Sequence, residues 1–220
     1  MAGLDFLYEV SDDELEVLAG IIREKGGITN ILKERSDYDT KNKYVKAVID
    51  ELLDFGGNTL LFQPDYAEVL KDVCKKMDVD IESDDSGEEM ENKLLSKVAS
   101  DLWDKMSEEG RRALLESMQE SANFGKTGSM AMFAAIFRAG GFKSYQLSVI
   151  IANSIAKLIL GRGLSLGVNA ALTRALSYFA GPIGILMGIW TCIQILGPAY
   201  RVTVPAVTYV AALRKMTKEK

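Results

Sequence analysis

The chain has 220 residues, a net charge of −5 and no histidine, and its two cysteines, Cys74 and Cys192, stand far apart. The missing histidine removes the commonest general base and metal ligand, so Ser–His and Cys–His catalytic arrangements are excluded. The two distant cysteines argue against a disulfide framework or a cysteine-based zinc site, and they suit a reducing cytoplasm.

The two halves of the chain carry opposite charge. Residues 1–120 contain 30 acidic and 15 basic residues, whereas residues 121–220 contain one acidic residue, Glu219, and 11 basic residues. Such asymmetry indicates a membrane surface or another polyanion as a partner. The basic side chains are scattered among aliphatic residues, so nucleic acid is not expected as that partner. Because no basic-then-apolar leader is visible, we expect a cytoplasmic protein, peripheral to or conditionally inserted in the inner membrane.

The acidic half is predicted to be a series of helices. Ser11 with Glu14, and Ser86 with Glu89, form capping-box patterns, in which each side chain satisfies a backbone N–H at a helix start. The pattern contains no alternating strand signal longer than a few residues, so the predicted fold class is all-α. Apolar residues recur at helical spacing in five segments: 11–26, 40–56, 64–77, 86–106 and 107–118.

The second half is predicted to contain a linker and an apolar helical region packed against the acidic one. The stretch 200–205 is rich in β-branched residues, and its pattern does not distinguish helix from strand. Helices are expected at 147–160, 164–180 and 183–196, each ended by glycine or Gly-Pro. The predicted regions are an acidic helical region at 1–122, a Gly-rich linker and amphipathic segment at 123–146, and an apolar, basic helical region at 147–220.

The longest uncharged run, 175–200, has 26 residues. Gly-Pro pairs at 181 and 197 interrupt it and leave 15 residues at 182–196, which is about 22 Å of helix and short for a membrane span. Permanent spans are therefore not expected. Two alternatives stay open: these helices form the buried core of a helical domain, or they form an apolar hairpin that inserts into an anionic membrane when triggered.

One motif resembles a phosphate-binding loop. Residues 124–129 contain its Gly-Lys-Thr ending, but Glu120 occupies the position of the first glycine and no strand precedes it. We interpret the segment as a flexible linker.

A second motif has the spacing of a calcium-binding loop, with Asp78, Asp80, Glu82 and Glu89 at ligand positions. The position that requires glycine for the sharp turn is Ser83, so we interpret the stretch as a solvated acidic loop. A weak divalent-cation site at 78–91 is the open alternative. The sequence predicts no catalytic residue, cofactor or metal ligand.

Several segments carry a family resemblance, and the sharpest is Ala-Tyr-Arg-Val-Thr-Val-Pro-Ala-Val at 199–207. The others are 4–7, 11–15, 55–57, 103–109, 181–184 and 213–216. Together they resemble YaaW-type proteins of bacteria from residue 4 to residue 216. The resemblance implies a mostly helical, intracellular protein without an established activity. Such proteins are grouped distantly with ubiquinol–cytochrome c chaperones, which are assembly factors, so the resemblance favours binding or assembly over catalysis.

The predicted function is that of a non-enzymatic helical protein that associates with an anionic membrane surface, or with itself, through its apolar C-terminal helices. The alternative is a soluble chaperone-like or adaptor protein whose C-terminal helices are only a buried core. For any one of the nominated residues, an ordinary structural role is the favoured interpretation. The candidate lipid-phosphate contacts are Lys157, Arg162, Arg174 and Arg201, and the candidate helix-packing ridge is Ala180, Gly184 and Gly188.

Overall fold

The structure is a computed structural model that describes residues 3–26, 31–57, 63–118, 130–164 and 198–219. This part of the chain is all-α, with two short 3₁₀ helices and no strand, and it confirms the predicted fold class. The elements are η1 (Asp5–Tyr8), α1 (Asp12–Gly26), η3 (Arg35–Asp37), α2 (Lys41–Gly56), α3 (Tyr66–Lys76), α4 (Gly87–Lys105), α5 (Glu108–Ser117), α6 (Met130–Ala139), α7 (Gly141–Leu160) and α10 (Pro198–Lys218).

Local capping explains where the helices of the acidic half begin. At α1 the Glu14 backbone N–H donates to Ser11 Oγ at 3.2 Å, and the Ser11 N–H donates to Glu14 Oε2 at 3.0 Å. At α4 the Glu89 N–H donates to Ser86 Oγ at 3.2 Å, and the Ser86 N–H donates to Glu89 Oε2 at 2.8 Å. Both predicted capping boxes are confirmed, and Asp65 begins α3 with a third one.

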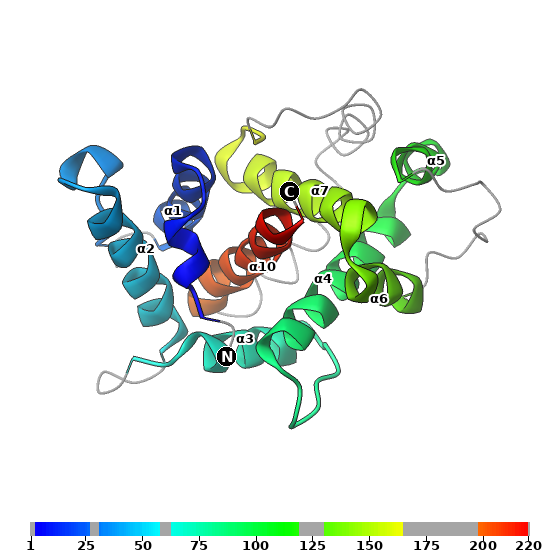
Figure 1. The fold of residues 1–220 in the computed structure, drawn as a ribbon, viewed down its shortest axis with the longest axis horizontal. Helices are drawn as coiled ribbons and strands as arrows, with labels where there is room; N and C mark the ends of the chain where they lie inside the picture. The colour runs from blue at the N-terminus through cyan, green and yellow to red at the C-terminus, as the bar shows by residue number, and fades with distance from the viewer. Residues whose placement is uncertain (1–2, 27–30, 58–62, 119–129, 165–197, 220) are drawn as a thin grey trace.

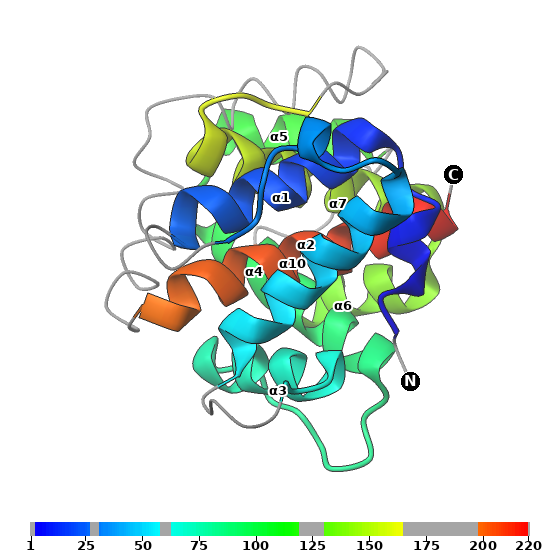
Figure 2. The same ribbon diagram turned by 90° about the vertical axis from the view of Figure 1, so that its left-hand side faces the viewer.

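Helix α10 lies in the middle of the molecule (Figures 1 and 2). It packs against α1, α2, α3, α4 and α7, and every residue from 202 to 216 is buried. The residues of α10 from 202 to 213 are uncharged and mostly apolar on every side, and such a stretch is stable only where neighbours cover it all round. The apolar C-terminal segment of the described chain is therefore core.

The ambiguous stretch 200–205 is helical, and Pro205 lies inside α10. Its β-branched residues favour strand only weakly, and burial against five helices outweighs that preference. The hydroxyl of Thr203 donates to the backbone oxygen of Ala199 at 3.2 Å, so this buried polar side chain has its hydrogen-bond partner within the same helix.

The two halves of the chain share one hydrophobic core. Tyr209 of α10 donates its hydroxyl proton to the backbone oxygen of Glu14 in α1 at 3.0 Å, and this bond joins the two ends of the sequence. Gly140 and Gly141 have φ angles of 69° and 75°, a left-handed conformation that ends α6 and lets α7 begin at Gly141, earlier than the predicted residue 147. The domain boundaries stay a prediction.

None of the described helices is both long enough and apolar enough to span a bilayer. The longest uncharged run of the sequence falls mostly within 165–197, which lies outside the described residues.

Candidate binding pocket between α4 and α6

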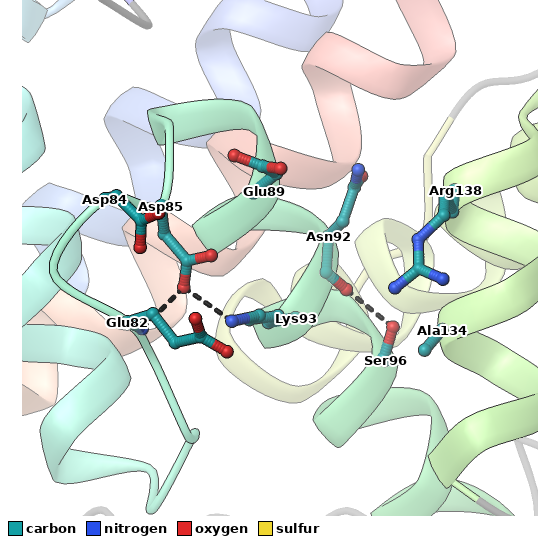
Figure 3. Close-up of a pocket in the computed structure, with 9 residues that line it drawn as sticks. All are labelled: Glu82, Asp84, Asp85, Glu89, Asn92, Lys93, Ser96, Ala134 and Arg138. Atoms are coloured by element: carbon teal, nitrogen blue, oxygen red, sulfur yellow. Dashed lines mark hydrogen bonds and ion pairs between the residues drawn. The ribbon is translucent and has the colours of Figure 1, made fainter.

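A pocket of about 390 Å³ lies where the loop before α4 meets α4 and α6 (Figure 3). Carboxylates form one wall, α4 forms the floor, and α6 forms the opposite wall. The lining residues are Glu82, Asp84, Asp85, Glu89, Asn92, Lys93, Ser96, Ala134 and Arg138.

Two of the four carboxylates of the acidic wall already have partners. Asp85 Oδ2 accepts from Lys93 Nζ at 2.5 Å and from the Glu82 N–H at 2.8 Å, and the hydrogen bond from Lys93 lowers the pKa of Asp85. Glu89 caps α4, and its hydrogen bonds with Ser86 lower its pKa. The Glu82 and Asp84 carboxylates make no hydrogen bond or ion pair with the described residues. The wall therefore retains uncompensated negative charge.

The floor and the opposite wall also contain polar groups without partners. The Oδ1 atom of Asn92 is buried, so it does not open into the pocket, and it accepts no hydrogen bond from the described residues. The Ser96 hydroxyl does not donate to this atom, because it donates to the backbone oxygen of Asn92 at 2.6 Å. Arg138 is exposed at the edge of α6, and within the described part of the chain its guanidinium forms no ion pair. The pocket thus offers carboxylates on one side and a single cation on the other.

The geometry does not assemble the calcium-type site suggested by the acidic spacing. Within the described ranges, no three or more Cys, Asp or Glu side chains are grouped so that they could hold a metal ion. Glu89, the residue that would supply the last ligand, instead caps the helix that follows. The interpretation of the stretch as a solvated loop agrees with the exposed side chains of Asp80 and Glu82.

A buried ion pair joins the acidic half to α10. Arg214 Nε donates to both Glu91 oxygens, at 2.8 and 3.1 Å, and the Tyr66 hydroxyl donates to Glu91 Oε1 at 2.8 Å. Arg214 also donates to the Gly3 backbone oxygen at 2.9 Å and lies 4.2 Å from the ring centroid of Phe6. The Glu91 residue is only 1% exposed, and burial raises its pKa while Arg214 opposes that shift.

A second, more exposed set of charges extends this contact. Glu88 accepts from Lys218 at 2.9 Å and from Lys215 at 3.5 Å, and the Lys218 hydrogen bond lowers the pKa of Glu88. Lys215 is buried and also donates to the Phe137 backbone oxygen at 3.3 Å. The start of α4 and the end of α10 are therefore held together by opposite charges from the two halves of the sequence.

Comparison with known proteins places this arrangement in a family. Residues 73–204 match the ubiquinol-cytochrome C chaperone family. A UPF0174 protein of Helicobacter pylori is 37% identical over 98% of this chain and 92% of its own length. The chain belongs to the UPF0174 proteins, within the ubiquinol-cytochrome C chaperone family. This confirms the resemblance inferred from the sequence.

Other UPF0174 proteins support the same assignment. A second one from Helicobacter pylori is 35% identical over 80% of this chain and 90% of its own length. The UPF0174 protein YaaW of Escherichia coli is 26% identical over 97% of this chain and 93% of its own length. No solved structure matches the chain. The family match covers α4, α5, α6 and α7, and it contains every lining residue of the pocket.

The structure places only some of the nominated residues of this UPF0174 protein. Lys157 is half-buried near the end of α7, Arg162 is exposed just beyond that end, and Arg201 is exposed in the first turn of α10. None of the three lines the pocket. Their proposed role at lipid phosphates stays a prediction. The remaining nominees lie outside the described residues: Arg174, Ala180, Gly184 and Gly188.

Sequence reasoning missed Arg138 and Asn92 as pocket residues. Arg138 gave a faint signal because it is the one charge in the otherwise apolar segment 130–139. Asn92 gave none, since an amide in an amphipathic helix is usually solvated. Only the packing of α6 on α4 brings the two residues to one pocket.

Proposed function

We propose that this UPF0174 protein is a non-enzymatic, chaperone-like protein that acts by binding another polypeptide. The observation that carries the proposal is the match of residues 73–204 to the ubiquinol-cytochrome C chaperone family. The absence of histidine from the whole sequence supports a binding role over acid–base catalysis.

The surface of the matched region supports binding of an apolar polypeptide. Phe142, in the first turn of α7, is 50% exposed, and Met130 at the start of α6 is 36% exposed. Large apolar side chains on a surface provide the contact area that binding to unfolded or helical segments requires. Met130 is the first residue of α6, which forms one wall of the pocket, and Phe142 follows shortly after the end of α6.

An aggregation assay tests the proposal. Citrate synthase is diluted from denaturant, and light scattering is followed with and without the purified chain and without nucleotide. We expect suppression at comparable molar concentrations of the two proteins, and weaker suppression by Phe142→Ser. The matched control is Ile31→Ser, which removes an exposed apolar side chain outside the matched region. No suppression by the wild-type chain, or an equal loss in both variants, would count against a chaperone-like surface.

A second candidate is association with an anionic membrane, or self-assembly, through the apolar C-terminal region. The uncharged run of 26 residues at 175–200 favours it. Co-sedimentation with phosphatidylglycerol vesicles, at neutral and acidic pH and low salt, tests the membrane form, and sedimentation velocity tests the assembly. A chain that stays monomeric and in the supernatant under all these conditions rules this candidate out.

A further inference from the structure

We infer that the pocket between α4 and α6 is the docking point of a basic amphipathic helix of the partner polypeptide, which places one lysine or arginine side chain in the pocket. This inference rests on the proposed function and specifies the chemistry of the partner. Charge complementarity and the uncovered face of α6 support it.

The acidic wall favours a cationic ligand. Two of its carboxylates, Glu82 and Asp84, are exposed and have no hydrogen bond or ion pair with the described residues. Two more, Asp85 and Glu89, add negative charge to the same wall, and only one of the four faces a lysine at hydrogen-bond distance. An ammonium or guanidinium group in this space gains attraction from several carboxylates at once.

The outer face of α6 fits a helix better than a small cation. Its exposed positions include Ala131, Ala135 and Ala139, with Arg138 as the single charge among them. The solvent face of a surface helix normally carries charged or polar residues. Short side chains let a second helix approach closely, because the distance between helix axes depends on the side chains at the contact. The exposed Phe142 lies just beyond the end of this face.

Arg138 limits the partner to a moderate positive charge. It lines the pocket opposite the acidic wall, as Figure 3 shows, so it repels a second cation placed beside the first. A repulsive charge of this kind gives specificity by disfavouring the wrong ligand. An amphipathic helix with separated basic residues is therefore preferred over a polycation such as spermidine.

Fluorescence anisotropy with a labelled peptide tests the inference. The probe is a designed helix with a Leu/Ala face and a Lys face, and the comparison probe has Glu in place of each Lys. We expect the Lys peptide to bind and Glu82→Gln/Asp84→Asn to weaken it about 3- to 10-fold. Ala135→Trp should also weaken it, because the indole obstructs the face of α6.

Opposite responses make the test specific. Arg138→Gln should tighten the Lys peptide about 2- to 5-fold, because it removes a repulsive charge. The double variant Glu9→Gln/Asp104→Asn removes the same charge from exposed positions outside the pocket and should leave the affinity unchanged. Circular dichroism confirms that each variant is folded as the wild type.

Three results would overturn the inference: equal binding of the Glu peptide, equal weakening by the control variant, or full competition by spermidine, which would assign the pocket to a free cation. The two assays together distinguish an error in the docking point from an error in the proposed function. If the chain suppresses aggregation but the pocket variants bind the peptide like wild type, only the docking point is wrong. If neither suppression nor binding occurs, the proposed function fails as well.

Discussion

Replacing Arg214 with methionine should destabilise the folded chain by about 3–5 kcal/mol at pH 7, because it leaves the carboxylate of Glu91 buried without its counter-charge. Methionine keeps much of the apolar volume, so the loss reports the charge rather than a cavity. Glu91 is 1% exposed. Without Arg214, the hydrogen bond from the Tyr66 hydroxyl at 2.8 Å is the one hydrogen bond that its carboxylate keeps among the described side chains. The contacts of Arg214 with Gly3 and Phe6 are also lost.

Urea denaturation followed by far-UV circular dichroism measures this loss, and Lys218→Met provides the matched control. Lys218 is also a cation of α10 paired with a glutamate of α4, but the side chains of Lys218 and Glu88 are 51% and 46% exposed. Solvent screens such a pair, so its removal should cost less than about 1 kcal/mol. The double variant Glu91→Gln/Arg214→Met should recover part of the loss, because the glutamine is neutral and still accepts from Tyr66.

The pH dependence identifies the cause. Burial raises the pKa of Glu91, and removing Arg214 removes the largest effect that opposes this rise. A carboxyl whose pKa is higher in the folded state binds protons more tightly there, so stability falls as the pH rises from the unfolded pKa through the folded pKa. The pKa of Glu91 is already raised in the wild type and should be higher still in Arg214→Met. The gap in stability between the two chains should therefore narrow on acidification between the folded-state pKa of the variant and that of the wild type, by about 1.4 kcal/mol for each pH unit there. A gap below about 1 kcal/mol at pH 7, or one that is constant with pH, would refute the reasoning.

Three further substitutions test the packing. Gly56→Ala should destabilise the chain by about 1–3 kcal/mol, because the added Cβ would clash with Val69 Cγ2, and adding Val69→Ala should reduce that penalty in urea titrations. Gln146→Met should raise the thermal midpoint, since Gln146 is 1% exposed and both its amide atoms lack partners among the described residues; a lower midpoint would contradict this. In a Cys192→Ser chain, Cys74 should react with a thiol reagent only after unfolding, because burial raises the pKa of Cys74 to about 12, and fast labelling of the native chain would disprove it.

Local signals predicted the helix starts of the acidic half correctly, but they did not predict the start of α7 or the conformation of 200–205. The boxes at Ser11 and Ser86 depend on side chains three residues from their partners, so the sequence contains the whole interaction. The segment 200–205 has weak and conflicting preferences, and Pro205 lies inside a helix that neighbouring helices cover on all sides. Its conformation depends on burial, and burial depends on residues far away in the sequence.

The candidate pocket was predictable only in part. The sequence shows the acidic stretch before α4 as a charged loop. It does not show that Arg138 forms the opposite wall of the pocket, because Arg138 lies far from the loop in the chain. The placement of Arg138 depends on the contact between α4 and α6. No spacing rule links residues on two such helices.

The sequence by itself determined the all-α class, the caps and the opposite charges of the two halves. Each of these follows from composition or from contacts within a turn of helix. Only the tertiary structure decided which of those charges became buried partners. Arg214 and Glu91 meet because α4 and α10 pack side by side around the shared core, and a charge leaves water at acceptable cost only where such packing supplies its counter-charge.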